Sequence, residues 1–297
     1  MNNFTYSVPT KIHFGKGQIS HLYELSESGN KVLLCYGGGS IKKAGIYDEA
    51  VKILKEEDIE IFELSGIAPN PKIESVREGV KLCKENDIDM VLAIGGGSVI
   101  DCAKVVAAGA CYDGDPWDLV ITPRWIKKAL PIYSVLTLSA TGSEMDPFAV
   151  ISDMSKNEKW GTASEHMKPK MSILDPEYTY SVSKKQTAAG TADMISHICE
   201  NYFTNVKNAD VQARFAEGLL KNCFKYGPIA LEEPDNYDAR ANLMWTASMA
   251  INGILSDGAE VSWCVHPMEH ELSAFYDITH GEGLAILTPH WMDFALN

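Results

Sequence analysis

The feature that most constrains the fold is a short apolar run followed by a glycine-rich turn, which occurs twice in the first half of the chain. Lys31–Tyr36 leads into Gly37-Gly38-Gly39-Ser40, and Asp89–Ile94 leads into Gly95-Gly96-Gly97-Ser98. Continuous apolar runs of this length are typical of strands that are buried on both faces of a parallel sheet. The two runs therefore predict an α/β fold built on parallel strands.

Segments with helical spacing separate these strands. The apolar positions predict helices over residues 47–57, 73–86 and 99–110, and Ile59–Leu64 has the pattern of a further strand. Strands that alternate with helices imply a parallel sheet covered by helices on both faces.

The second half of the chain has a different character, because strand signals fade after Lys184. Residues rich in Ala, Met and Leu at helical spacing predict helices over Lys184–Tyr202, Asp210–Tyr226, Tyr237–Leu255 and Pro267–Ala274. We therefore predict two domains, a nucleotide-binding α/β domain of residues 1–178 and an all-helical, metal-binding domain of residues 179–297.

The glycine-rich turns suggest a nucleotide. Such a turn lets the backbone approach a diphosphate, and the N-terminus of the following helix offers N–H donors. Neither turn is a GxGxxG fingerprint or a P-loop, so a tight turn without a ligand is the alternative. Two turns at the carboxyl ends of parallel strands favour a nucleotide, and the lack of a carboxylate in Gly37–Ser40 favours NADP(H) over NAD(H).

Histidines and one carboxylate have the spacing of a metal site. Asp193 and His197 are four positions apart in a helical segment, so they share one face, and His266 and His270 repeat that spacing before His280. One carboxylate and several imidazoles suit zinc or ferrous iron. An isolated Asp/His pair is more often a surface hydrogen bond, but clustering among apolar neighbours favours a metal site.

Charge and cysteine content limit the partners and the compartment. The formal net charge of −14 argues against a nucleic-acid partner. No apolar run is long enough to span a bilayer, and the first residues lack the pattern of a signal peptide. The seven cysteines are scattered, without a CxxC motif, which is typical of reduced thiols. We expect a cytoplasmic protein with no membrane partner.

Several motifs along the whole chain resemble, in order, the iron-containing (group III) alcohol dehydrogenase family. They are Pro9–Gly15, Gly95–Asp101, Thr137–Glu144, Ala189–Glu200, and the histidines His266, His270 and His280. The uncharged first turn and Glu271 resemble the branch of NADPH-dependent butanol dehydrogenases and aldehyde reductases. The resemblance implies a Rossmann-like parallel-sheet domain followed by an all-α domain, as in dehydroquinate synthase.

The resemblance also implies roles for individual residues. It implies that Fe²⁺ or Zn²⁺ is held by Asp193, His197, His266 and His280. It implies cofactor contacts from Gly37, Gly38, Ser40, Asn70, Gly96, Gly97, Ser98, Asp101, Thr137, Leu138, Thr141, Ser143, Lys159 and Tyr178.

His270, expected near the substrate without binding the metal, and Asp101 are the candidate catalytic residues. For Asp101, contact with the ribose and capping of a helix are both open. Lys159 and Tyr178 have simpler alternatives, a solvated loop and a packed aromatic.

The activity that the resemblance implies is hydride transfer between NADP(H) and a small primary alcohol or aldehyde, such as butanol or butanal, in a homodimer. One alternative is an enzyme like dehydroquinate synthase or glycerol-1-phosphate dehydrogenase, which would require a basic cluster such as Lys156, Lys159, Lys168 and Lys170. Another is an inactive nucleotide-binding remnant. Family members usually continue further, so we expect the chain to be a fragment, truncated after Asn297.

Overall fold

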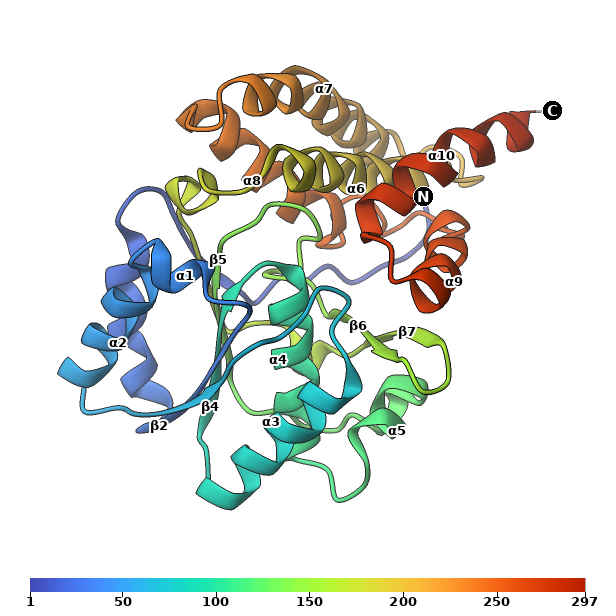
Figure 1. The fold of residues 1–297 in the computed structure, drawn as a ribbon. Coiled ribbons are helices and arrows are strands. Elements are labelled where there is room, and N and C mark those ends of the chain that lie inside the picture. The colour runs from blue at the N-terminus through green and yellow to red at the C-terminus, as the bar shows by residue number, and fades with distance from the viewer. Residues whose placement is uncertain (297) are drawn as a thin grey trace. The chain divides into compact units, whose positions relative to one another are not determined.

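The chain forms two compact units in a computed structural model that describes residues 1–296 (Figure 1). The α/β unit comprises Pro9–Thr137 and Ser143–Tyr178. The helical unit comprises Met1–Val8, Leu138–Gly142 and the chain from Thr179 onward. One border of the units falls between residues 178 and 179, but the domain boundary at this position stays a prediction, since two short earlier segments belong to the helical unit.

A six-stranded sheet organises the α/β unit, and every neighbouring pair of its strands is parallel. In spatial order the strands are β1 (Lys11–Phe14), β8 (Met171–Leu174), β5 (Ile132–Leu136), β4 (Met90–Gly95), β2 (Lys31–Tyr36) and β3 (Glu60–Leu64). The predicted α/β class with a parallel sheet is thereby confirmed. An antiparallel hairpin, β6 (Phe148–Asp153) and β7 (Glu158–Ala163), forms a second sheet.

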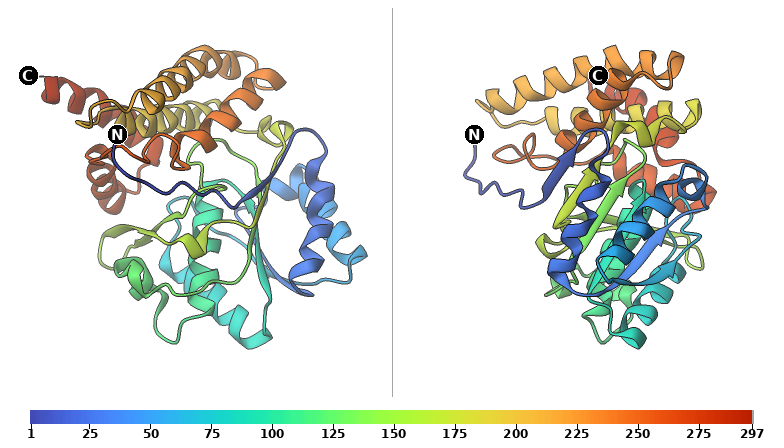
Figure 2. Two further views of the ribbon diagram at one scale, coloured as in Figure 1. Left: turned by 180° about the vertical axis from the view of Figure 1, so that it is seen from behind. Right: turned by 90° about the vertical axis from the view of Figure 1, so that its left-hand side faces the viewer.

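Helices connect the strands of this unit. They are the 3-10 helix η1 (Gln18–Ser28), α1 (Ser40–Lys43), α2 (Ile46–Glu56), α3 (Ile73–Asn86), α4 (Gly97–Ala110) and α5 (Pro116–Ile121), with short 3-10 turns η2 (Pro123–Trp125), η3 (Glu165–Met167) and η4 (Pro176–Thr179). Figure 2 shows η1 and α2 lying together beside the sheet.

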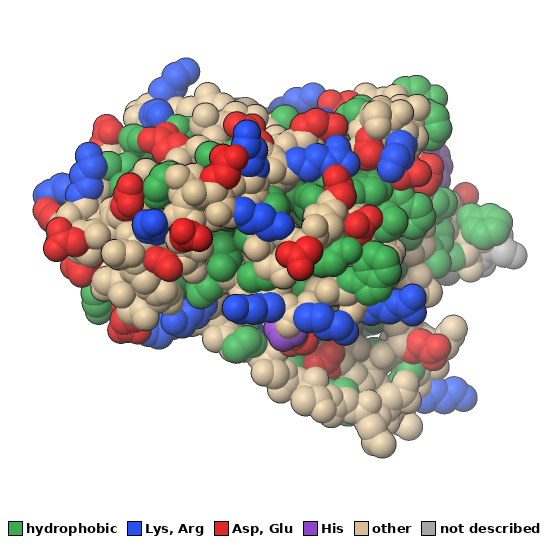
Figure 3. Space-filling model, turned by 90° about the horizontal axis from the view of Figure 1, so that it is seen from below, with side chains coloured by type: hydrophobic (Ala, Val, Ile, Leu, Met, Phe, Trp, Pro, Cys, Tyr) green, Lys and Arg blue, Asp and Glu red, His purple; other side chains and the backbone are tan. Residues whose placement is uncertain are grey.

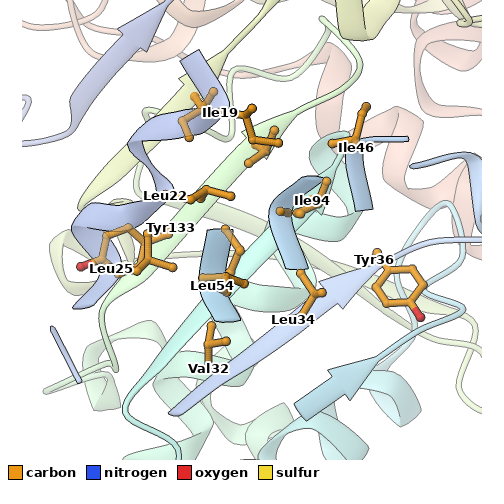
Figure 4. Packing of buried hydrophobic residues seen from close by; sticks show 14 of the residues in the cluster. Ile19, Leu22, Leu25, Val32, Leu34, Tyr36, Ile46, Leu54, Ile94 and Tyr133 are labelled. Carbon is orange, nitrogen blue, oxygen red and sulfur yellow. The ribbon is translucent and has the colours of Figure 1, made fainter. Parts of the chain in front are cut away.

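The strand period of two explains how the core is built. Val32 and Leu34 of β2 point to the same face as Ile94 of β4, and on that face they pack against Ile19 of η1 and Leu54 of α2 (Figure 4). The residues between them on β2 and β4 are also buried, against the opposite face. Each such aliphatic side chain contributes about 1.5–3 kcal/mol when it is fully buried. Burial on both faces fixes the register that brings the carboxyl ends of β2, β4 and β5 together.

The helical unit is built from α6 (Lys184–Tyr202), α7 (Asp210–Glu232), α8 (Tyr237–Ile251), α9 (Val265–Tyr276) and α10 (His280–Leu296). α6 packs against α7 and α10, and α9 packs against α10. Met194, Ile198 and Leu243 lie at the centre of this core. Three details differ from the sequence-based prediction: α7 continues past Pro228, α8 ends at Ile251 and not at Leu255, and α10 was not predicted.

Charged side chains of both signs are interspersed on the face drawn in Figure 3, with hydrophobic side chains between them. Within residues 1–296, no helix combines the length and the apolar character needed to cross a membrane.

Candidate active site

Helix α6 holds the carboxylate at the centre of the candidate metal site. The side chain of Ser183 caps the start of this helix by accepting a hydrogen bond from the backbone of Gln186. Asp193 and His197 lie one turn apart and are both buried, with Asp193 Oδ1 3.5 Å from His197 Nε2. The predicted shared helix face is therefore present.

Two later helices bring further imidazoles to the same carboxylate oxygen. His266 lies in the first turn of α9 and His280 is the first residue of α10. The Nε2 atom of each ring is 3.8 Å from Asp193 Oδ1. Ligand atoms of a tetrahedral ion with bonds of 2.0–2.2 Å are separated by about 3.4 Å, so each histidine lies at nearly the distance from Asp193 that a shared metal would impose. One donor atom from each of Asp193, His266 and His280 lies within 4.8 Å of the other two.

Unsatisfied atoms at this position support the fit of a cation. Asp193 Oδ1 and His266 Nε2 are buried and make no hydrogen bond. Such atoms cost free energy unless a partner is supplied, and a divalent ion would satisfy both. The donor set of one carboxylate and three imidazoles is one that Fe²⁺ and Zn²⁺ accept.

Two buried glutamates, which the sequence reasoning missed as functional residues, orient the histidines. Glu200 contacts His266 Nδ1 and also accepts hydrogen bonds from the backbone N–H groups of Val265 (2.7 Å) and His266 (3.2 Å) at the start of α9. Glu269 contacts His280 Nδ1. A carboxylate on Nδ1 fixes the proton there and turns the Nε2 lone pair toward the metal position.

The charge balance of the cluster also favours a cation. Burial would raise the pKa of Asp193, but the three histidines hold it far below its ordinary value, so this side chain is an anion. Burial lowers the pKa of His197 to about 4. Burial acts in the same direction on His266, but Asp193 and Glu200 outweigh it and raise its pKa to about 9. The negative charge that retains a proton on His266 would equally retain a metal ion.

A close backbone contact fixes the start of α10 against α6. A Cβ atom placed on Gly281 would lie 2.0 Å from the carbonyl oxygen of Ala189. Only glycine permits this approach. Gly281 follows His280 directly, so the contact sets the distance between His280 and the α6 ligands.

His270 and Trp263 lie beside the cluster. The His270 ring centroid is 5.6 Å from that of His280. Trp263, whose φ of 41° is unusual for a bulky residue, meets the rings of His197 and His266 edge-on, at 5.9 and 5.0 Å. His270 is thus close to the cluster, and its place near the substrate without binding the metal stays a prediction.

Replacing Glu200 with glutamine is expected to lower metal affinity about 10- to 100-fold, which is the usual effect of losing a carboxylate behind a ligand histidine. The amide keeps the size of the side chain but loses the charge on His266 Nδ1. Metal titration of the purified protein measures the effect. Glu232→Gln, on the exposed end of α7, is the matched control and should bind metal normally. Equal affinities for the two variants would contradict the role of Glu200.

The candidate nucleotide-binding residues gather at the carboxyl edge of the sheet. Gly37 follows β2, Gly96 follows β4 and Thr137 follows β5, and these three strands are adjacent. The backbone N–H of Thr137 donates to the carbonyl of Gly95 at 3.0 Å. Helix α4 begins at Gly97, so the backbone N–H groups of Gly97 and Ser98 lie at this edge.

Polar pairs connect other predicted cofactor residues. Lys159 lies on β7, is buried, and donates to Asn70 Oδ1 at 3.1 Å. The alternative of a solvated loop for Lys159 is therefore wrong. Tyr178 packs partly buried against the sheet core, as a packed aromatic would. Lys156 and Lys168 pair with Asp153 and Glu165, so acids engage two of the four lysines of this region.

Asp101 links two elements of the α/β unit. Its two oxygens accept hydrogen bonds from Ser143 Oγ at 2.6 Å and from the backbone N–H of Val150 at 2.9 Å. Because α4 begins at Gly97, Asp101 lies in the second turn and does not cap the helix, so that alternative is wrong.

Leu138, Thr141 and the metal cluster belong to the helical unit. Leu138 lines a pocket with Thr191 and Met194 of α6. The segment Leu138–Gly142 ends at Gly142, whose φ is +71°. A Cβ atom there would lie 2.7 Å from the backbone oxygen of Ala247 on α8, so this close approach requires glycine. The remaining predicted cofactor residues lie in the α/β unit.

Comparison with known families agrees with this arrangement. Residues 9–176 match the family described as iron-containing alcohol dehydrogenase. Residues 187–297 match the C-terminal part of the same family. The chain belongs to the iron-containing alcohol dehydrogenase family. The expected membership is confirmed, and with it the expected class of enzyme, a nicotinamide-dependent oxidoreductase.

Relatives in this family include proteins named for either nicotinamide nucleotide. The chain is 60% identical to "NADH-dependent butanol dehydrogenase A" of Clostridium acetobutylicum, over 100% of its own length and 77% of that protein. It is 44% identical to "NADPH-dependent aldehyde reductase YqhD" of Escherichia coli, over 97% of its length and 75% of that protein.

A solved structure of the family has the same fold. The crystal structure of NADH-dependent butanol dehydrogenase A from Thermotoga maritima superposes with a TM-score of 0.96 at 47% identity. The match covers 99% of this chain and 74% of that one.

Proposed function

We propose that the chain interconverts small primary alcohols and aldehydes, such as butanol and butanal, with a nicotinamide nucleotide and a divalent metal held by Asp193, His197, His266 and His280. The observation that carries the proposal is the convergence of three imidazole Nε2 atoms on the buried Asp193 Oδ1, which makes no hydrogen bond. The names of relatives support the substrate class.

The chemistry divides between the bound ion and the protein. Fe²⁺ or Zn²⁺ bound there would supply Lewis acidity to the substrate oxygen, and the nucleotide would supply or accept hydride. Glu200 and Glu269 keep the Nδ1 protons of His266 and His280 in place, so that their Nε2 lone pairs stay available. His270 is proposed to pass the proton between the substrate oxygen and solvent, since an imidazole changes charge near neutral pH.

The nucleotide is proposed to lie at the carboxyl edge of the sheet. The backbone of Gly37 and Gly38 and the first turn of α4, from Gly96 to Ser98, would receive its phosphates. Ser40, Thr137, Leu138, Thr141 and Tyr178 complete the proposed contacts. Asp101 is proposed to act by positioning Ser143, because both of its oxygens are engaged, while Lys159 positions Asn70.

For the choice of nucleotide, the open first turn leads us to propose that NADPH is accepted. A Cβ atom on Gly38 would meet nothing within 4 Å, so the turn has room for a 2′-phosphate, and it carries no acid to repel one. Relatives at 60% identity are named as NADH-dependent, so we expect NADH to be used as well.

Gly38→Asp is expected to lower kcat/KM for NADPH by about tenfold or more and to leave that for NADH within a few-fold, because a carboxylate repels the 2′-phosphate and binds a 2′-OH. Gly38 has room for the side chain, and its backbone does not require glycine. Gly38→Asn has the same size without the charge and serves as the control. A parallel loss with both nucleotides in Gly38→Asp would rule out an electrostatic role for this turn.

The direct test of the proposal is aldehyde reduction by the metal-loaded protein. Nucleotide oxidation should follow the addition of butanal, should cease after chelation and should return when Fe²⁺ or Zn²⁺ is restored. Turnover that is indifferent to chelation would remove the metal from the proposal, and turnover of a phosphorylated substrate alone would replace the substrate class.

A homodimer in the cytoplasm is the further part of the proposal. All seven cysteines are free thiols and five of them are buried, which suits a reducing compartment. Sedimentation of the purified chain would test the dimer.

A further inference from the structure

A second group of metal-binding side chains lies in the α/β unit. His13 is on β1, and His21 and Glu24 are on η1. One donor atom from each of the three side chains lies within 4.8 Å of the other two. We propose that His13, His21 and Glu24 form a second divalent-metal site, suited to Zn²⁺, which fastens the edge strand β1 to η1.

Local geometry brings the three donors together. His21 and Glu24 are three positions apart in a 3-10 helix, where side chains at that spacing lie over one another. The His21 Nδ1 atom is 3.1 Å from Glu24 Oε1, and His13 Nε2 is 3.0 Å from the same oxygen. The two imidazole rings stack with centroids 3.6 Å apart and planes within 10°. Both ring nitrogens therefore face one carboxylate oxygen.

An unsatisfied nitrogen points to a ligand at this position. His13 Nε2 is buried and makes no hydrogen bond, although Glu24 Oε1 lies 3.0 Å away. A buried nitrogen with no hydrogen bond costs free energy. Zinc bonds of about 2.1 Å would separate neighbouring donors by about 3.4 Å, so each nitrogen needs to move only a few tenths of an ångström from Glu24 Oε1. The two stacked rings would also turn, so that both nitrogens point at the ion.

An ion pair on the far side of the carboxylate orients Glu24 toward the two imidazoles. Lys11 binds Glu24 Oε2 at 2.7 Å, which leaves Oε1 directed at the imidazoles.

The donor set also indicates the metal. Two imidazoles and a carboxylate are a set that zinc binds with an open fourth position for water. All three residues are partly exposed, so an ion can enter from solvent. None of them belongs to the unit that holds Asp193 and its histidines, so the two sites can be emptied independently.

Zinc stoichiometry tests the proposal in the full chain. Chelator-treated protein is equilibrated with buffered Zn²⁺ at pH 7.5, and bound metal is measured by elemental analysis. The wild type is expected to hold about two equivalents, and both His21→Asn and His266→Ala about one, because each loses one site. The double variant is expected to hold none, and His166→Asn, on an exposed histidine, about two.

Outcomes of this experiment separate the two sites. About two equivalents in His21→Asn, or about one in the wild type that is lost in His266→Ala, would overturn the second site without affecting the first. A thermal readout in the His266→Ala background adds a check that does not depend on activity. Zn²⁺ should raise the Tm of His266→Ala but not that of the variant that also carries His21→Asn, and equal shifts would overturn the proposal.

Discussion

Asp193→Asn is expected to lower the rate of metal-dependent aldehyde reduction by about 10³-fold or more, which corresponds to about 4 kcal/mol of lost transition-state stabilisation. Asp193 Oδ1 lies within 3.8 Å of the Nε2 atoms of His197, His266 and His280. Asparagine keeps the shape but removes the only negative charge at the centre of the cluster. Without that charge, the cluster attracts a cation less strongly, and metal affinity should fall together with the rate.

The measurements are metal content and kcat/KM with butanal. Asp210→Asn, at the exposed start of α7, is the matched control and should retain both. If Asp193→Asn kept its metal and lost less than about tenfold in rate, Asp193 would not be a ligand. Circular dichroism of the variant checks that the helices remain folded.

Lys104→Met is expected to lower the free energy of unfolding by about 3–5 kcal/mol, because it leaves a buried carboxylate without its partner. Lys104 is fully buried on α4, and its Nζ donates to Asp146 Oδ1 at 2.8 Å and to the carbonyl oxygens of Asp146 and Phe148 at 2.9 and 2.8 Å. Methionine fills the same space but supplies no hydrogen bond and no charge. The change therefore isolates the polar interaction from the packing.

Chemical denaturation measures this loss, and two further variants interpret it. Adding Asp146→Asn to Lys104→Met removes the unpaired charge and should recover part of the lost free energy. Lys52→Met, in a pair with Glu56 that is exposed on α2, should change stability by less than about 1 kcal/mol. A loss below about 1 kcal/mol in Lys104→Met would mean that the buried pair is not important for stability.

The central strands could be predicted from the sequence because burial on both faces makes them continuous apolar runs. β2 was predicted with its observed bounds, and β4 to within one residue. β1 and β8 have four residues each, which is too short for a pattern to emerge. Helix α10 begins with His280-Gly281-Glu282-Gly283 and contains Pro289, which are residues typical of a loop, and its helical state depends on packing against α6 and α9.

The candidate site was predictable only in part, because tertiary packing brings some of its residues together. Asp193 and His197 share a helix face, which spacing alone can show. His266 and His280 reach that face through tertiary packing, so only the family resemblance implied them. Glu200 and Glu269 were missed, although a carboxylate within about one turn of a candidate ligand histidine could have suggested such a role.

The placement of the four candidate ligands also bears on how the helical unit opens. Glu200 and His266 are in contact although they lie 66 positions apart in the sequence, and α7 and α8 fill the interval. An ion held jointly by α6, α9 and α10 would tie the two ends of that interval together, as a covalent cross-link does. Local unfolding of α9 and α10 would then require release of the ion, so metal supply would set how long these helices stay closed to a protease.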